Sequence, residues 1–473
     1  MSNFICELPL VITPYDERNL SIRFEMGRYL YNAVLKESLV RLKLLKESKL
    51  YKKALKTKDL KKRNKLFKAA REKYKFSDYE LQKFAIISKN NCDIKKHLDT
   101  HICQKIATRV YIASNEYILK KRGKPRFKRK GWISSLEGKS NKSGIRFRDS
   151  CICWNGLQLK ILFDKKDKHG VQAHALNCKT KYVRIVKRKI KGKIRFFAQL
   201  IQEGNPFIKE KNKITKAVAG LDIGPSTIAC CSDKKSFLID FCNGIKPLSK
   251  KIKFYQKKID RSRRAMNKDN YDSKKRVKRG KLAWNVSNRY KKIKDKIYEA
   301  NRKLKENRKR SHNILANFII SLGNVIKTEK ISYKFFQKAF GRSVNFRGPG
   351  MFLEILRRKA ENAGGYVEEF NTRTTFLSQS CHCGDRKKKS LSKRWHICRC
   401  GVKAQRDLYV SFLARYVEDN YLNISQAQKN WAGANVLLEQ AMLRLAQTTK
   451  GEIVPSSFGL SQRSGLLVKG KSG

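Results

Sequence analysis

Four cysteines, arranged in two pairs, are the residues with the clearest chemical potential in this chain. The segment Gln379–Asp407 reads QSCHCG, DRKKKSLSKRWHI, CRCG and VKAQRD, so a glycine closes each pair and a basic loop separates them. Residues i and i+2 of a strand point the same way, so two thiolates at this spacing can converge on one ion. The pattern predicts a zinc knuckle with the ligands Cys381, Cys383, Cys398 and Cys400. Two alternatives stay open: a histidine ligand (His382 or His396), or reduced cysteines packed without metal.

Three acidic residues stand where carboxylates could bind Mg²⁺. Asp222 in GLDIG and Glu329 after NVIKT lie at the ends of apolar strands, and Asp407 opens the apolar helix LYVSFLARY. Carboxylate oxygens are the hard ligands that Mg²⁺ prefers, and three of them can hold two ions about 4 Å apart for phosphodiester hydrolysis. Singly, each could form a salt bridge, and Asp407 could merely cap its helix. The three together favour a metal-dependent hydrolytic site.

The charge of the chain indicates a polyanionic partner. Among 473 residues, 110 are Lys or Arg and 39 are Asp or Glu, which gives a net charge of +71. Self-repulsion of this size opposes compaction unless a polyanion binds, so we expect a nucleic-acid-binding protein with strongly salt-dependent affinity. A ribosomal-type or histone-like packing protein is the alternative. Hydrophobic residues at 40% and aromatic residues at 10% favour about two to four packed domains instead.

The chain shows no sign of a secretory or membrane protein. The segment MSNFICELPLVI lacks a basic region and a small-residue cleavage site, and no window reaches the roughly 18 apolar residues of a membrane span. The 13 cysteines then point to thiols and metal in a reducing compartment. We therefore expect a cytoplasmic protein, associated with the nucleoid when it is bound to DNA, and no membrane partner.

Hydrophobic periodicity predicts the elements that must position these residues. Residues 4–13 form a strand that a turn at Pro14–Asp16 ends, and basic helices follow from Arg23 to about Lys120. Short β-branched runs between residues 144 and 202 predict a small, barrel-like β-domain.

A buried strand opens a new domain at Ala217. Residues 250–310 form a long basic helical region broken near 267–272, in which His312 at its end is expected to contact phosphate or solvent. Strands at 324–332 and 365–371 enclose a helix at 351–363, and an added helical segment covers 424–447. The tail after about Gly451 is expected to be mobile.

The order GLDIG, TEKI, QSCHCG, CRCG and QRD resembles the split RuvC-type nuclease of TnpB proteins and their relatives, the compact type V CRISPR effectors. Further matches are PRFK at Pro125–Lys128, Tyr31-Asn32 in the first helix, and Lys359–Glu361 followed by Gly364. Two features depart from the family pattern. The cysteine pairs are Cys-x-Cys rather than Cys-x-x-Cys, and Tyr409–Ser411 replace Asn-Ala-Ala.

The resemblance implies an α/β fold with added α and β modules. It comprises a β-barrel wedge domain with an inserted helical recognition domain, then an RNase H-like (RuvC) nuclease domain with a zinc-ribbon insert. The expected domains are the first wedge strands 1–22, the recognition insert 23–120, the wedge barrel 121–215, the nuclease 216–374 with the helical region 250–310, the zinc-ribbon insert 375–403, the last part of the nuclease 404–450 and the tail 451–473.

The resemblance also implies an RNA-guided DNA endonuclease whose partners are a guide RNA and target DNA. Asp222, Glu329 and Asp407 would hold two Mg²⁺ ions, and the four cysteines one Zn²⁺. The residues expected to contact nucleic acid are Arg126, Phe127, Lys128, Arg394 and Arg406. The alternatives are a guided or plain DNA-binding protein that does not cut, and a DNA transposase with an RNase H-like core.

Overall fold

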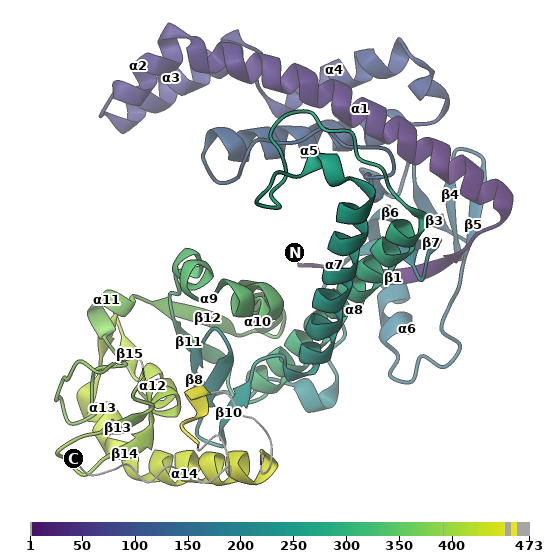
Figure 1. The fold of residues 1–473 in the computed structure, drawn as a ribbon. Coiled ribbons are helices and arrows are strands. Elements are labelled where there is room, and N and C mark those ends of the chain that lie inside the picture. The colour runs from purple at the N-terminus through teal and green to yellow at the C-terminus, as the bar shows by residue number, and fades with distance from the viewer. Residues whose placement is uncertain (1, 391, 450–455, 461–473) are drawn as a thin grey trace. The chain divides into compact units, whose positions relative to one another are not determined.

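The computed structural model describes residues 2–390, 392–449 and 456–460, and it divides the chain into two compact units (Figure 1). Unit 1 is Met1–Phe207 and unit 2 is Ile208–Gly473. In the described part of the chain, no helix is long and apolar enough to cross a membrane.

Unit 1 is an antiparallel sheet into which a series of helices is inserted after the first strand. Its seven strands lie in the order β2-β6-β7-β1-β5-β4-β3. The elements are β1 (Asn3–Val11), α1 (Pro14–Glu47), α2 (Lys49–Lys56), α3 (Leu60–Lys73), α4 (Asp78–Asn90), η1 (Asp93–Lys96), α5 (Thr100–Ile118), β2 (Ser135–Glu137), β3 (Arg146–Arg148), β4 (Cys151–Trp154), β5 (Leu157–Ile161), α6 (Val171–Asn177), β6 (Thr180–Ile190) and β7 (Lys193–Glu203). The helices inserted after β1 extend from Pro14 to Ile118.

Helix α1 begins earlier than the sequence analysis predicts. Pro14–Asp16, interpreted above as a turn, form its first turn. Thr13 is the N-cap: its hydroxyl accepts the amide of Asp16, and the Asp16 carboxylate accepts the amide of Thr13 at 3.0 Å. Proline is favourable at the first helical position because that amide has no partner in a helix. Because of this capping box, residues Pro14–Asp16 begin a helix instead of forming a turn after the strand.

Two motifs of the family pattern meet in unit 1. The Asn32 side chain on α1 donates to the backbone carbonyl of Lys128 at 3.0 Å and accepts the Lys128 amide at 2.8 Å. The amide side chain thus pairs with the backbone as a neighbouring strand would. This contact fixes the segment that carries Arg126 and Phe127, both of which are exposed.

Unit 2 contains a five-stranded mixed sheet in the order β10-β9-β8-β11-β12. β8, β9 and β10 are antiparallel neighbours, and β11 is parallel to both β8 and β12. The elements are η2 (Glu210–Asn212), β8 (Val218–Ile223), β9 (Thr227–Cys231), β10 (Ser236–Asp240), η3 (Asn243–Ile245), α7 (Lys246–Met266), η4 (Lys268–Asn270), α8 (Asn288–Ile320), β11 (Val325–Glu329), α9 (Tyr333–Arg347), α10 (Pro349–Asn362), β12 (Tyr366–Phe370), α11 (Thr372–Thr375), β13 (Trp395–Ile397), β14 (Lys403–Gln405), α12 (Arg406–Ala414), β15 (Val417–Glu418), β16 (Tyr421–Leu422), α13 (Ile424–Lys429), α14 (Trp431–Thr448) and η5 (Ser456–Phe458).

Alternation along the strands gives this sheet two apolar faces. Ala219, Leu221 and Ile223 of β8 join a core with α8 and α10. Ala229 of β9 and Leu238 of β10 join a second core with α12 and α14. Residues of β8 with even numbers therefore face the α12 side, because successive side chains of a strand alternate.

Two sequence expectations differ from the structure in unit 2. His312 on α8 is fully buried: its ring stacks on Phe241 with centroids 5.1 Å apart, and its Nε2 lies 2.9 Å from the Arg347 carbonyl oxygen. In the predicted tail, Phe458 and Leu460 are buried in the core beneath α12 and α14. The other tail residues, 451–455 and 461–473, lie outside the described residues.

Candidate carboxylate and cysteine sites

Two of the three predicted carboxylates sit on adjacent parallel strands of unit 2. In the pairing of β8 with β11, Leu221 lies opposite Thr328, so Asp222 and Glu329 follow one position further along both strands. Leu221 faces the α8 and α10 side, and the next residues therefore face the α12 side. Both carboxylates thus project from the same end of neighbouring strands toward α12.

Asp407 comes from the helix that covers this face. It lies in the first turn of α12, where the positive end of the helix dipole stabilises a negative charge. The N-cap is Gln405, whose side-chain oxygen accepts the Leu408 amide at 2.8 Å. Asp407 is therefore not the capping residue, so helix capping does not explain its position.

The three carboxyl groups affect one another's ionisation. Burial raises the pKa of Asp222 well above its ordinary value, and the charges of Asp407 and Glu329 raise it further. Burial also raises the pKa of Asp407, against the opposing influence of Arg406 and Arg394, and raises that of Glu329 to about 7. The structure therefore brings together three carboxylates that need additional positive charge to ionise together.

The two arginines predicted near this region lie beside the carboxylates. Arg406 Nε donates to Asp407 at 3.3 Å, and both Arg394 and Arg406 lower the pKa of Asp222. The Arg406 amide donates to the Arg394 carbonyl at 2.8 Å, which holds the two residues next to each other. Arg126, Phe127 and Lys128 belong to unit 1.

Glycine at position 220 allows α12 to lie directly on β8. A Cβ atom at Gly220 would collide with the carbonyl oxygen of Ser411 and crowd the side chains of Ala414 and Arg415. A glycine inside a strand commonly marks such a close approach of another backbone. GLDIG carries this signal, which the sequence analysis did not use. The contact sets the distance between the strand of Asp222 and the helix of Asp407.

Gly220→Ala should therefore lower the free energy of unfolding of unit 2 by about 3 kcal/mol, the upper end of the range for overpacked cores. The cost is high because the added Cβ meets the backbone of Ser411, which cannot move aside as a side chain can. The measurement is the midpoint of thermal or urea unfolding. Gly433→Ala is the matched control: Gly433 lies on α14 with open space around it, and alanine favours a helix by about 1 kcal/mol. Equal midpoints for the two variants would contradict the packing argument.

The four cysteines converge as the sequence predicts. Their sulfur atoms all lie within 4.8 Å of one another, with Cys381 and Cys400 at 3.5 Å and Cys383 and Cys398 at 3.6 Å. Tetrahedral zinc with Zn–S bonds of about 2.3 Å separates its sulfurs by about 3.8 Å, so the donor set fits this ion. Within the described residues, this is the one group of three or more potential ligands that converges so tightly. Asp222, Glu329 and Asp407 do not form such a group.

The two Cys-x-Cys turns share one hydrogen-bond pattern. In the first turn, the Gly384 amide donates to the Cys381 carbonyl, and the Cys381 amide donates to the Asp385 carbonyl. In the second turn, the Gly401 amide donates to the Cys398 carbonyl, and the Cys398 amide donates to the Val402 carbonyl. Gly384 and Gly401 adopt φ of +91° and +93°, which other residues rarely adopt. The glycine after each pair therefore closes the turn that the shorter spacing requires.

Tyr409 connects the cysteine cluster to α12. Its hydroxyl lies 3.3 Å from Cys381 Sγ, accepts the His382 amide at 2.9 Å and lies 2.9 Å from His382 Nδ1. The His382 ring stacks on Trp431 at 4.9 Å between centroids, and neither His382 nor His396 belongs to the converging group. The sequence analysis noted Tyr409 only as a departure from the family pattern. Its role depends on contacts between segments far apart in the chain.

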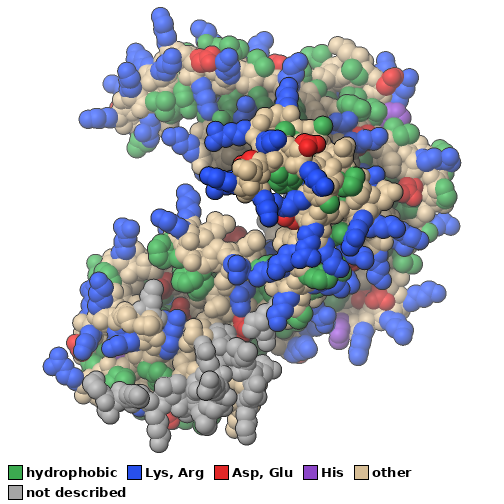
Figure 2. All heavy atoms as spheres, in the orientation of Figure 1, with side chains coloured by type: hydrophobic (Ala, Val, Ile, Leu, Met, Phe, Trp, Pro, Cys, Tyr) green, Lys and Arg blue, Asp and Glu red, His purple; other side chains and the backbone are tan. Residues whose placement is uncertain are grey.

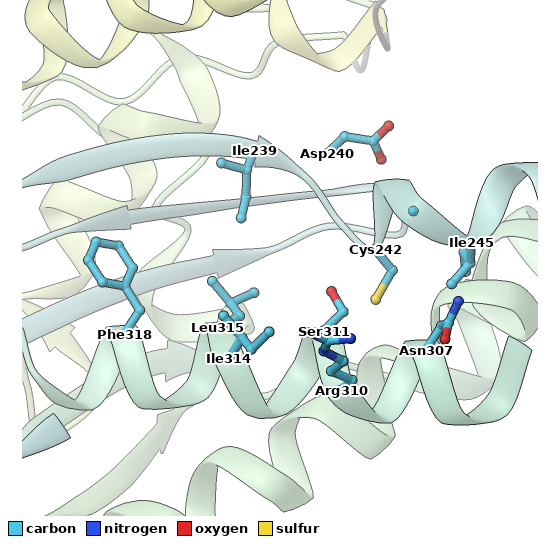
Figure 3. Close-up of a pocket in the computed structure, with 11 residues that line it drawn as sticks. Ile239, Asp240, Cys242, Ile245, Asn307, Arg310, Ser311, Ile314, Leu315 and Phe318 are labelled. Atoms are coloured by element: carbon cyan, nitrogen blue, oxygen red, sulfur yellow. The ribbon is translucent and has the colours of Figure 1, made fainter. Parts of the chain in front are cut away.

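A separate pocket of about 540 Å³ lies between β10 and α8 (Figure 3). Ile239, Ile245 and Leu315 are among its lining residues, and its carboxylate, Asp240, pairs with Arg347 at 3.0 Å. The pocket contains none of the predicted site residues.

Comparison with known proteins gives a match to a family model and likenesses to solved structures, of which two are described below. Residues 350–412 match the family described as "Cas12f1-like, TNB domain". This segment contains the four cysteines and Asp407, and the match confirms the predicted resemblance to compact type V CRISPR effectors. No curated protein matches the chain.

The solved structures are distant in sequence. One is a chain of the cryo-EM structure of the Cas12f1–sgRNA–target DNA complex, with 15% identity, a TM-score of 0.42, and coverage of 87% of this chain and 98% of that chain. The other comes from a cryo-EM structure of a CRISPR-Cas12f ternary complex, with 14% identity, a TM-score of 0.28, and coverage of 84% and 82%.

Proposed function

We propose that this chain, which over residues 350–412 matches the Cas12f1-like TNB domain, is an RNA-guided effector that cuts DNA. The observation that carries the proposal is the group of three carboxylates. Burial and the charges of Asp407 and Glu329 raise the pKa of Asp222. A net charge of +71 supports nucleic acid as the partner. The resemblance to compact type V CRISPR effectors implies a guide RNA and target DNA as these nucleic acids.

The proposed architecture follows the resemblance. Unit 1 would serve as the wedge domain, with α1–α5 as the recognition insert that holds guide RNA and reads a flanking DNA motif. Unit 2 would be the RuvC-like nuclease, with the cysteine cluster as its zinc-ribbon insert. Arg126, Phe127 and Lys128 in unit 1, and Arg394 and Arg406 in unit 2, would contact the phosphate backbone. The finer domain boundaries stay predictions.

The proposed catalytic roles divide among the residues already described. Asp222, Glu329 and Asp407 would hold two Mg²⁺ ions, which supply activation of water and stabilisation of the leaving oxygen. Arg406 orients Asp407 through the 3.3 Å hydrogen bond, and Arg394 adds positive charge on the same side. Cys381, Cys383, Cys398 and Cys400 would hold one Zn²⁺ in a structural role.

The experiment purifies the full chain, sequences any RNA that copurifies, and incubates this complex with matching DNA. We expect an RNA with one constant and one variable part, and cleavage that EDTA stops and Mg²⁺ restores. Guided binding without cleavage would support a non-cutting binding protein instead. Strand transfer of DNA ends without RNA would indicate a transposase, and the absence of both RNA and guided binding would overturn the proposal.

The raised pKa of Glu329 predicts a pH dependence with a defined sign. A carboxyl group must be ionised to bind a metal, so Mg²⁺ affinity should rise by up to about tenfold per pH unit below the pKa of about 7 and level off above it. Without Mg²⁺, the folded protein keeps this proton up to about pH 7, whereas the unfolded chain loses it near 4.5. The free energy of unfolding should then fall as the pH rises between these values.

Isothermal titration with Mg²⁺ and thermal unfolding at several pH values measure the two effects. Glu329→Gln cannot titrate and should weaken both effects, leaving the part due to Asp222 and Asp407, whereas Glu361→Gln on α10 should leave them in place. An unchanged profile in Glu329→Gln would assign the titration to another group.

A further inference from the structure

The segment that joins α7 to α8, residues 267–287, is unusually long for a connection between two packed helices. Such connections usually span about 2–8 residues, and loops longer than about 12–15 are commonly either functional or disordered. We call this segment the connecting loop. The sequence analysis expected only a short break near 267–272, so the loop is a feature that neither the carboxylate site nor the cysteine cluster explains.

The connecting loop is held in one conformation by asparagine side chains. Asn267 donates to the Arg263 carbonyl at 2.8 Å and the Asn285 carbonyl at 3.0 Å, and it accepts the Asn285 amide at 2.7 Å. Asn270 donates to the Ala283 carbonyl at 2.6 Å. Because these bonds join the first and last parts of the loop, they close its base without a hydrophobic core.

Arginines of α7 fix the loop from the side. The Arg263 guanidinium lies 3.7 Å from the centre of the Trp284 ring, and Arg264 lies 4.9 Å from that of Tyr271. The Tyr271 and Trp284 rings meet edge to face at 6.1 Å, and Arg264 also donates to the Lys275 carbonyl at 3.0 Å. Each aromatic ring thus has a cation over one face, and these contacts attach the loop to α7.

The tip of the loop carries a dense positive charge. Residues 274–281 read KKRVKRGK, and all six cations among them are exposed: Lys274, Lys275, Arg276, Lys278, Arg279 and Lys281. No ion pair joins any of them to a carboxylate in the part of the chain that the structure describes. The nearby Asp272 carboxylate accepts the backbone amide of Arg276 at 2.7 Å. Lys and Arg side chains also gather over α7 and α8 (Figure 2).

A run of charges that only faced solvent would not require the hydrogen bonds that fix the base of the loop. Like charges repel one another and favour an extended, mobile chain. Holding six cations together is favourable when a polyanion neutralises them, and fixing them beforehand lowers the entropy lost on binding. We infer that the connecting loop is a preformed site for the phosphodiester backbone of a nucleic acid.

The same contacts indicate backbone rather than base recognition. Stacking on bases needs a free aromatic face, whereas Trp284 and Tyr271 are half-buried and each has an arginine over one face. Binding should therefore depend little on sequence and strongly on salt. The inference shares with the proposed function only the assumption of a nucleic-acid partner, and RNA and DNA offer the same phosphodiester chemistry.

The test measures binding of the full chain to polyuridine RNA and to a mixed-sequence DNA duplex over a series of salt concentrations. The charge variant is Lys274→Gln/Arg276→Gln/Lys278→Gln/Arg279→Gln. Each lost contact lowers the slope of log affinity against log salt by about 0.7 on single strands or 0.9 on a duplex, so four contacts lower it by about 3. The conservative variant Lys274→Arg/Lys278→Arg keeps the charge and should bind as the parent does.

Trp284→Ala tests the effect of the fixed loop conformation separately from the effect of charge. It removes the ring beneath Arg263 and changes no charge, so affinity should fall severalfold if the preformed conformation matters. A reduced slope with RNA alone, or with DNA alone, supports the site and identifies its ligand. Unchanged slopes in the charge variant with both nucleic acids overturn the site, and unchanged affinity in Trp284→Ala overturns the preformed conformation. These outcomes stand whether or not the protein cuts guided DNA, so failure of the proposed function is recognised separately.

Discussion

Asp222→Asn should abolish DNA cleavage and leave RNA and DNA binding nearly unchanged. The variant keeps the size of the side chain but removes an anionic ligand from the group formed with Glu329 and Asp407. Loss of a residue that merely supports a metal ligand commonly lowers activity or metal affinity about 10–100-fold, so loss of a ligand itself should exceed 100-fold. The measurement is the rate of a single round of cleavage at saturating protein, beside a filter-binding assay.

The same substitution should not harm the fold. Burial and the charges of Asp407 and Glu329 raise the pKa of Asp222, so an ionised carboxylate is unfavourable there without metal. A neutral amide relieves that repulsion, and we expect the unfolding midpoint in EDTA to stay the same or rise. Asp419→Asn, at an exposed position with φ of +48° that asparagine tolerates, is the matched control and should cut normally. Substantial cleavage by Asp222→Asn would remove this residue from the site.

Loss of the metal at the four cysteines should unfold the surrounding part of unit 2. Structural zinc contributes about 10–16 kcal/mol of apparent binding free energy in small zinc domains, and here its loss also exposes the buried Cys381. Cys400→Ser should therefore bind no zinc and unfold at a clearly lower temperature. Metal analysis should find one zinc per chain in the parent protein, and a zinc-free parent with unchanged stability would favour packed thiols.

Tyr409→Phe tests whether the cysteine cluster is coupled to α12, the helix that carries Asp407. The phenylalanine ring can keep the packing against Trp431, whereas the hydroxyl contacts to Cys381 and His382 are lost. Zinc affinity in a chelator competition should fall about 10–100-fold, and hydrogen exchange in α12 should increase. Tyr416→Phe, on a half-buried tyrosine after the same helix, is the control. Unchanged zinc affinity would make the Tyr409 hydroxyl a packing feature alone.

The sequence predicts much of this site because its signals are local. Asp222, Glu329 and Asp407 each adjoin an apolar strand or helix, and glycines mark the cysteine turns. Parallel strands with matched hydrophobic alternation then bring the first two carboxylates to one face. The capping box at Thr13 and the glycine in GLDIG were equally readable, and each would have improved the prediction.

Other features depend on contacts that no local pattern contains. His312 stands in a basic run, yet its position on α8 turns it toward Phe241, and burial lowers its pKa to about 4. The connecting loop has a composition typical of disorder, and contacts between its ends, such as the pairing of Asn267 with Asn285, order it. Likewise, the Tyr409 hydroxyl meets Cys381 only after the sheet and α12 have packed together.

The spread of the carboxylates along the chain has a consequence during translation. Asp407 is synthesised about 185 residues after Asp222, which at about 5–20 residues per second is an interval of about 10–40 s. Until then a ribosome-bound chain can fold β8, β9 and β10 and expose its basic helices to RNA, but it lacks the helix that completes the carboxylate group. If the proposed function holds, a nascent or prematurely terminated chain should not cut DNA, and the order of synthesis would let RNA binding precede cleavage.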